Sequence, residues 1–110
     1  MASLSTHILD TSIGLPAPNV SVICQRRDGE VWTMVGEGAT DQDGRIQNLH
    51  GHQSMTPGTT YRLTFHTGAY FQSQATTVFY PKVEVQFIVG KDKNHYHVPL
   101  LLNPFGYSTY

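Results

Sequence analysis

The chain has 110 residues, 39% hydrophobic and 14% charged, enough to bury the core of a single domain spanning 1–110. Its 7 basic and 8 acidic residues give a formal net charge of -1, and Arg26-Arg27 alone is no basic stripe for nucleic acid. No apolar run approaches the ~20 residues of a membrane helix, and Met1–Asp10 lacks the pattern of a secretory signal.

The cysteine and histidine contents bear on compartment and chemistry. Cys24 is the single cysteine, so no intrachain disulfide can form, and its apolar neighbours predict a buried, inert thiol. We therefore expect a cytoplasmic protein. The six histidines mildly favour proton chemistry or metal binding, because imidazole titrates near neutral pH.

The first half of the chain predicts strands separated by turns. Alternation over Leu4–Leu9 puts His7 on the face opposite to Thr6 and Ile8. The Asp28-Gly29 pair predicts a hairpin, since Asp-Gly suits positive φ angles. The expected strands are 4–9, 20–25, 31–37 and 45–49, with a loop over 10–18.

The second half adds further strands and one weak helix. Strands are expected over 61–66, over 83–89 and from His95 onward, with a loop over 48–58 and a short helix over 68–76. Seven or eight short strands with regular turn signals predict an all-β fold, an antiparallel β-sandwich with one short helix.

The strand that begins at His95 carries two histidines on one face, followed by an apolar run and a break at Asn103-Pro104. Structural histidines, a metal site and acid/base chemistry remain three open interpretations. A zinc site would take His95 and His97, with a third ligand from His7, His50 or His52, but no spacing signature supports it.

Three other features could carry chemistry. Asp41–Gly44 begins like a calcium loop but lacks the closing carboxylate, so a tight turn is expected. Arg45 follows directly, and a solvated strand residue is the favoured interpretation; in a cleft, its guanidinium would suit a planar heterocycle or a developing oxyanion. Ser108 lacks the partner spacing of a catalytic triad.

Five motifs occur in order across almost the whole chain: Leu4-Ser5-Thr6-His7-Ile8-Leu9-Asp10, Asp43-Gly44-Arg45, Phe79-Tyr80-Pro81-Lys82-Val83-Glu84, His95-Tyr96-His97-Val98-Pro99-Leu100-Leu101-Leu102 and Tyr107-Ser108-Thr109-Tyr110. In this order they resemble the 5-hydroxyisourate hydrolase family, also called transthyretin-related proteins. The resemblance implies a transthyretin-like β-sandwich assembled as a homotetramer. Family members usually continue Tyr-Arg-Gly-Ser where this sequence ends at Tyr110.

The resemblance also implies an activity, the opening of the 5-hydroxyisourate ring to a 2-oxo-4-hydroxy-4-carboxy-5-ureidoimidazoline in urate degradation. Carried over, the site is His7, Arg45, His97 and Tyr110, in a channel between dimers. The two histidines would activate water, the arginine would stabilise developing negative charge, and Tyr110 would close the pocket. Which histidine is the base stays open.

The supporting residues expected are Ser108 and His95, with no metal and no cofactor. The expected partner is the small-molecule substrate, without nucleic acid or membrane. The alternative is a transthyretin-like carrier of small aromatic ligands without turnover. Transthyretin itself lacks this combination of His, Arg, His and Tyr, which favours the enzyme. Some relatives are peroxisomal, so the peroxisome is the second choice of compartment.

Overall fold

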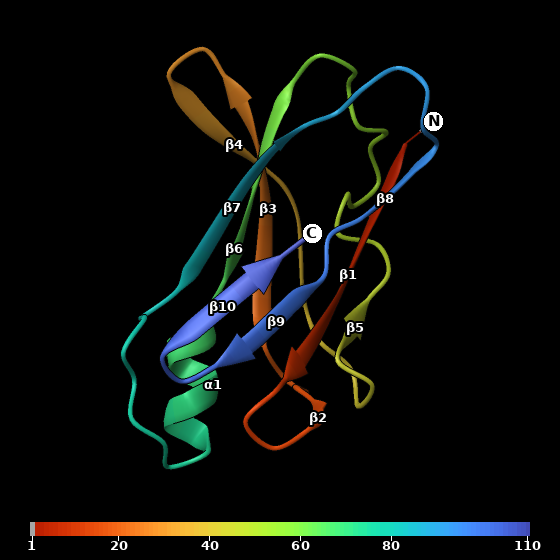
Figure 1. The fold of residues 1–110 in the computed structure, drawn as a ribbon. Coiled ribbons are helices and arrows are strands. Elements are labelled where there is room, and N and C mark those ends of the chain that lie inside the picture. The colour runs from red at the N-terminus through yellow and green to blue at the C-terminus, as the bar shows by residue number, and fades with distance from the viewer. Residues whose placement is uncertain (1) are drawn as a thin grey trace.

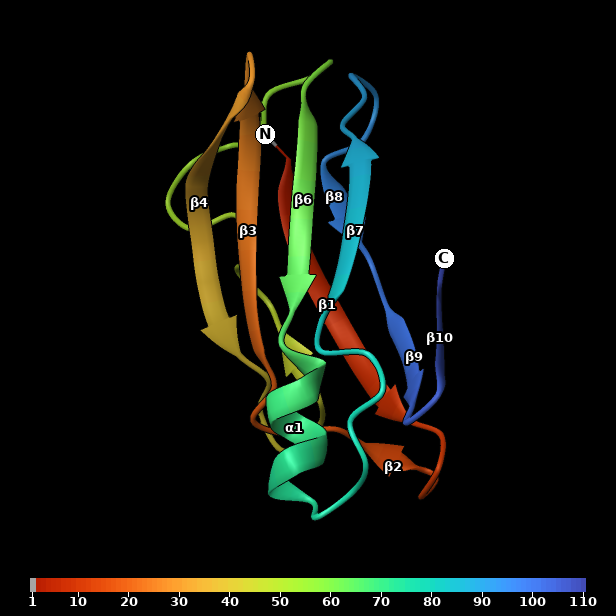
Figure 2. The same ribbon diagram turned by 90° about the vertical axis from the view of Figure 1, so that its left-hand side faces the viewer.

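The computed structural model describes residues 2–110, which form two β-sheets packed face to face with one helix at the lower end in Figures 1 and 2. The four-stranded sheet has the order β4-β3-β6-β7. Its strands are antiparallel and comprise β3 (Ser21–Asp28), β4 (Val31–Ala39), β6 (Thr60–Phe65) and β7 (Val83–Ile88).

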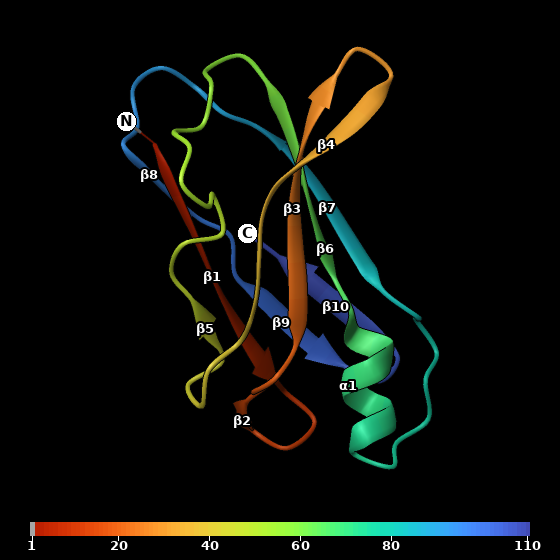
Figure 3. The ribbon, with the colours of Figure 1, turned by 180° about the vertical axis from the view of Figure 1, so that it is seen from behind.

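The six-stranded sheet is built around β1, which runs through the order β10-β9-β1-β2 and also pairs with β5 and β8. Its members are β1 (Ser3–Asp10), β2 (Leu15–Pro16), β5 (Arg45–Ile46), β8 (His95–His97), β9 (Leu100–Asn103) and β10 (Gly106–Thr109). Figure 3 shows β5, β8 and β9 gathered around β1 from behind. This sandwich with one short helix confirms the expected fold class.

The pairing within the six-stranded sheet departs from a purely antiparallel one, because β1 runs parallel to both β8 and β9. The strand expected from His95 onward is also divided at Pro99, which has no N–H to donate to a ladder. The strand expected over 45–49 shrinks to Arg45–Ile46. Beyond the expected break at Asn103-Pro104, the chain forms one more strand, β10.

The core follows from the alternation along β1, whose even-numbered residues are buried while the odd-numbered ones are half-buried on the outer face. Leu4 and Ile8 are fully buried, and they lie in one cluster with Leu63, Phe65 and Leu102. The outer face of β1 is therefore the one that carries His7, opposite to Thr6 and Ile8 as the alternation predicted.

Helix α1 (Thr67–Ser73) follows β6 directly, close to the expected range. The backbone N–H of Gly68 donates to the Pro81 carbonyl at 3.0 Å, and a side chain at this position would collide with that backbone. Tyr70 is buried and its hydroxyl donates to the Asp10 carboxylate at 2.7 Å, which fastens the helix to the end of β1. No helix within residues 2–110 is long and apolar enough to cross a membrane.

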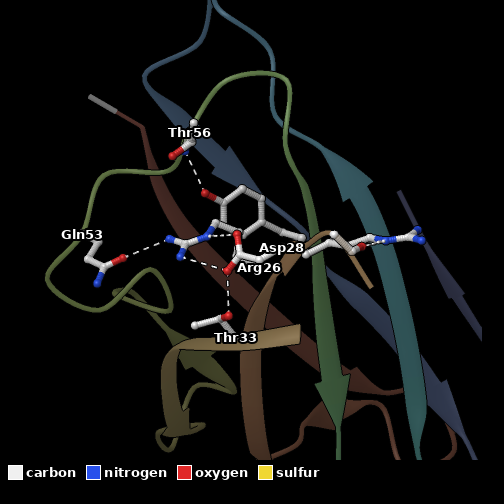
Figure 4. Close-up of polar contacts among 8 residues, drawn as sticks. Arg26, Asp28, Thr33, Gln53 and Thr56 are labelled. Atoms are coloured by element: carbon white, nitrogen blue, oxygen red, sulfur yellow. Dashed lines mark hydrogen bonds and ion pairs between the residues drawn. The ribbon is translucent and has the colours of Figure 1, made fainter. Parts of the chain in front are cut away.

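The long segment between β5 and β6 makes polar contacts with β3 and with β6 (Figure 4). Arg26 donates to both carboxylate oxygens of Asp28, at 3.0 and 3.2 Å, and to the Gln53 side-chain oxygen at 3.4 Å. The Thr56 backbone N–H donates to the Tyr61 hydroxyl at 2.7 Å. These contacts fix the segment that follows the arginine of β5.

Candidate functional site

His7 and Arg45 are brought together by strand pairing. They are Cα partners in the antiparallel pair of β1 and β5, so their side chains leave the sheet on the same face. His7 is half-buried and Arg45 is exposed. The two residues lie 38 positions apart in the sequence, so their contact depends on the fold and not on local spacing.

The turn before β5 fixes the start of that strand. The Asp41 Oδ1 atom accepts backbone N–H bonds from Asp43 at 2.9 Å and Arg45 at 3.0 Å. Gly44 has φ of +75°, and its carbonyl accepts the Ile8 N–H at 2.8 Å. A side chain at Gly44 would collide with the Ile8 carbonyl. Glycine is therefore required, and the expected tight turn is confirmed.

The two histidines of β8, His95 and His97, lie next to β1. Ser3 and Ser5 of β1 are the Cα partners of His95 and His97 in the parallel ladder. The Ser5 hydroxyl oxygen lies 2.8 Å from Nδ1 of His97 and 2.9 Å from Nε2 of His95. Ser5 thus joins the two imidazoles, which are both exposed.

These strands border a cleft of about 420 Å³, lined by Ser5, Thr6, Arg45, Ile46, Gln47, His95 and His97. Three predicted site residues, Arg45, His95 and His97, share this lining. His7 is not part of the lining, but it lies directly opposite Arg45 on the same face. A volume of this order is at the small end of the range for small-molecule sites.

The electrostatics of the cleft act on His97. Desolvation lowers the pKa of His97 below its ordinary value, and the positive charges of Arg45, His7 and His95 lower it further. These groups reach it from β5, β1 and β8, respectively. The lowered pKa favours a neutral imidazole near neutral pH, which is the form that can accept a proton from water.

Tyr110 and Ser108 lie apart from this cleft. Ser108 pairs with Leu101 of β9, which pairs with Leu9 of β1, so Ser108 shares the outer face of His7 at a distance of two strands. Tyr110 follows β10 and is 79% exposed. Neither residue lines the cleft within one chain. Their expected roles remain predictions.

The remaining histidines divide between two environments. His50 Nδ1 accepts the Leu4 backbone N–H at 3.2 Å, and His52 is exposed beside it in the loop. His66 is half-buried and caps α1 without a side-chain hydrogen bond. Across residues 2–110, no group of three or more His, Cys, Asp or Glu side chains is arranged to hold a metal ion.

Ser3 and Ser5 are the site residues that sequence reasoning did not single out. Serine on a strand face carries no signal by itself, because it is a common solvated residue. The usable signal was the alternation that puts Ser5 on the face of His7, but the parallel register that brings His95 and His97 alongside was needed to complete it.

Comparison with known proteins gives a consistent result. Residues 4–110 match the model of the HIUase/Transthyretin family. The chain is 48% identical over 107 residues to the 5-hydroxyisourate hydrolase of Salmonella dublin, covering 97% of this chain and 78% of that one. Its structure resembles the Klebsiella pneumoniae 5-hydroxyisourate hydrolase, with 36% identity, a TM-score of 0.86 and coverage of 100% and 97% of the two chains.

Transthyretin from Sparus aurata is also similar in structure, with 36% identity, a TM-score of 0.89 and coverage of 98% of this chain and 94% of that chain. Both branches named by the family model are therefore represented among the similar structures. The match of that model to nearly all of the sequence shows that this chain belongs to the HIUase/Transthyretin family.

Proposed function

We propose that this chain hydrolyses 5-hydroxyisourate to 2-oxo-4-hydroxy-4-carboxy-5-ureidoimidazoline, a step of urate degradation. The observation that carries the proposal is the pairing of His7 with Arg45 next to the cleft lined by His97. The names of the similar bacterial enzymes support the same substrate.

The chemistry needs a proton acceptor and a cation close to one carbonyl group. An imidazole takes a proton from water as the water oxygen attacks C6 of the substrate. The N1–C6 bond then breaks, and the proton returns to N1 as the ring opens. Arg45 stabilises the negative charge that develops on the substrate oxygen, since its guanidinium presents several N–H donors in a fixed plane. His7 and His97 position the water.

Tyr110 and Ser108 would act in the site of a neighbouring subunit. Both lie on or next to β10, away from the cleft of their own chain. In a homotetramer with sites between dimers, these residues of one subunit would close the cleft of another. The openness of the His7 face in a single chain is consistent with such an arrangement. Light scattering on the purified protein tests it, and a monomer with full activity would contradict it.

The activity is tested with freshly generated 5-hydroxyisourate, whose decay is followed by its ultraviolet absorbance. Wild-type protein should accelerate the decay. His97→Asn should lose about 10²–10⁴-fold in kcat, the usual contribution of general acid–base catalysis. Arg45→Glu should lose at least about 10²-fold, the usual effect of removing one charge-stabilising donor.

The control variants replace a histidine and an arginine that lie outside the cleft. His52 lies in the loop before β6, and Arg27 is exposed on β3 of the other sheet. His52→Asn and Arg27→Glu should retain activity within about a factor of two. Decay of 5-hydroxyisourate at the buffer rate with wild-type protein would discard the proposal.

A carrier without turnover is the second candidate, because the sea bream transthyretin structure in complex with thyroxine matches with 36% identity and a TM-score of 0.89. Calorimetry with an iodinated or polyphenolic aromatic compound tests this alternative. Tight binding together with no hydrolysis would favour the carrier. The cytoplasmic location also remains a prediction, testable by cell fractionation.

A further inference from the structure

The hydroxyl group of Ser5 lies between two imidazoles. Its oxygen is 2.8 Å from Nδ1 of His97 and 2.9 Å from Nε2 of His95. A hydroxyl has one hydrogen and two lone pairs, so Ser5 donates to one of these nitrogens and accepts from the other. If Ser5 donates to His95 Nε2, then His97 must carry its hydrogen at Nδ1. If Ser5 donates to His97 Nδ1, then His95 must carry its hydrogen at Nε2.

The bond between Ser3 and the other nitrogen of His95 decides which of these two arrangements is present. The Ser3 hydroxyl lies 3.4 Å from the Asn94 carbonyl oxygen, to which it donates, and 2.5 Å from Nδ1 of His95. Both contacts are hydrogen bonds at the same time only when the Ser3 hydrogen is directed to the Asn94 carbonyl, which can only accept, and the Ser3 oxygen accepts from His95 Nδ1–H. The neutral His95 ring then has its lone pair at Nε2, which accepts the hydrogen of Ser5.

His97 is the last member of this sequence. Because the Ser5 hydrogen is donated to His95, the Ser5 oxygen accepts a hydrogen from Nδ1–H of His97. The neutral His97 ring is thereby protonated at Nδ1 and has its lone pair at Nε2. Within residues 2–110, Nε2 of His97 makes no hydrogen bond, and the ring itself lines the cleft.

We propose that Ser5, supported by Ser3, is a positioning residue that holds His97 in the Nδ1–H tautomer, so that Nε2 of His97 is the proton acceptor for the attacking water. This inference rests on the proposed hydrolase function and makes His97, rather than His7, the general base. The water proton passes to Nε2 while the oxygen bonds to C6, and the same proton returns to N1 as the N1–C6 bond breaks. The imidazolium formed in between keeps its Nδ1–H bond to Ser5.

The charged and titratable groups around His97 agree with this role. Arg45 on β5, His7 on β1 and His95 on β8 act on it, and with desolvation they lower its pKa. His97 is therefore neutral over more of the pH range than a free imidazole. A base also needs its lone pair directed at the substrate, and this second condition is what the Ser5 bond provides.

The tautomer can be measured without any substrate. Long-range ¹H–¹⁵N correlation spectra of protein with ¹⁵N-labelled histidine rings, at a pH well above the His97 pKa, report which ring nitrogen carries the hydrogen. Wild-type His97 should be protonated at Nδ1. Ser5→Ala should move it toward the Nε2–H form, and Ser5→Thr, which keeps a hydroxyl, should restore the wild-type spectrum. An Nε2–H tautomer in wild type, or no change in Ser5→Ala, would overturn the proposal.

Turnover gives an independent measurement on the same variants. Ser5→Ala should lower kcat on the order of tenfold, part of the full contribution of a general base, with KM changed less than about two-fold. Ser5→Thr should recover most of the loss. The control is Ser21→Ala, an exposed serine on β3 of the other sheet, which should leave kcat unchanged.

The two proposals fail in different ways. If wild-type protein does not hydrolyse 5-hydroxyisourate, the proposed function fails while the tautomer measurement still reports on Ser5. If wild-type protein is active and Ser5→Ala has the same kcat, the role of Ser5 is refuted and the hydrolase function stands. Circular dichroism and light scattering on Ser5→Ala confirm that a loss of kcat is not a loss of fold or assembly.

Discussion

His7 and Arg45 are Cα partners across the β1–β5 pair, so an imidazole and a guanidinium leave the six-stranded sheet on the same face. The Arg45 charge also acts on His97, the histidine of the neighbouring strand β8. In the proposed site, one arginine would therefore serve two functions. It would bind the negative charge that develops on the substrate, and its own charge favours the neutral, proton-accepting form of His97.

This double role predicts a pH dependence. Because the pKa of His97 is lowered by desolvation first and then by Arg45, the neutral base is present below the pH at which a free imidazole is half protonated. The acid limb of kcat/KM should therefore lie at lower pH than the pKa of a histidine model peptide. An acid limb above that pKa would contradict the assignment of His97.

Direct titration separates the contribution of Arg45. The Cε1–H resonance of His97, followed by NMR, should titrate at higher pH in Arg45→Gln than in wild type, since removing a positive charge favours the protonated ring. The matched control is Arg27→Gln, on the β3 strand of the other sheet, which should leave the His97 titration unchanged. Equal shifts in both variants would show that the effect is not local.

Much of the fold could be read from the sequence because its signals are local. Alternation located β1 and assigned its residues to two faces, and Asp-Gly located the β3–β4 hairpin. The parallel pairing of β1 with β8 and β9 joins segments about 90 positions apart, and no local pattern encodes that register. The two-residue strands β2 and β5 are too short to show a period.

Some residues of the candidate site could also be named from the sequence, and others needed the structure. His7 and His97 were candidates from the histidine pattern, but the resemblance to a family joined them with Arg45 in one site. The place of Arg45 at the start of a strand had favoured a solvated residue. Ser5 needed the register, since its role depends on lying beside His97 and not on its residue type. The proposed role of Tyr110 requires a second subunit, so it could be obtained neither from local pattern nor from one chain.

The buried thiol of Cys24 should be unreactive in the folded protein. Its side chain is fully buried in the core, and burial raises the pKa of the thiol to about 12, so almost no thiolate is present at neutral pH. Ellman's reagent at pH 8 should label the native protein far more slowly than protein in guanidinium chloride, where the full thiol content should appear. Equal rates in the two conditions would mean that Cys24 is accessible.

The bond between Tyr70 and Asp10 should contribute to stability. The Tyr70 hydroxyl donates to Oδ2 of the buried Asp10 carboxylate, while Ser12 binds the other oxygen. Tyr70→Phe leaves Oδ2 without that donor and should lower the free energy of unfolding by about 1–3 kcal/mol. Denaturant titration measures this loss. Tyr107→Phe, at a tyrosine that is 46% exposed, should stay within about 0.5 kcal/mol of wild type.

Replacing Gly44 by alanine should reduce both the stability of the fold and the activity of the site. Its φ of +75° is left-handed, and an added Cβ would collide with the Ile8 carbonyl and press on Pro16 at 3.1 Å. Gly44→Ala should therefore lower the free energy of unfolding by about 3 kcal/mol, combining backbone strain with overpacking. Because Gly44 precedes Arg45, kcat/KM should fall as well.

Gly29 separates the two causes of that loss. Its φ of +66° is also left-handed, but an added Cβ would meet no atom within 4 Å. Gly29→Ala should therefore cost only the backbone strain, about 1 kcal/mol, and leave kcat/KM unchanged because the β3–β4 hairpin lies away from the cleft. Denaturant unfolding and steady-state kinetics on both variants give the comparison. If both variants lost the same free energy of unfolding and the same kcat/KM, the Ile8 carbonyl would move aside without cost. Gly44 would then not be needed to hold Arg45 in place.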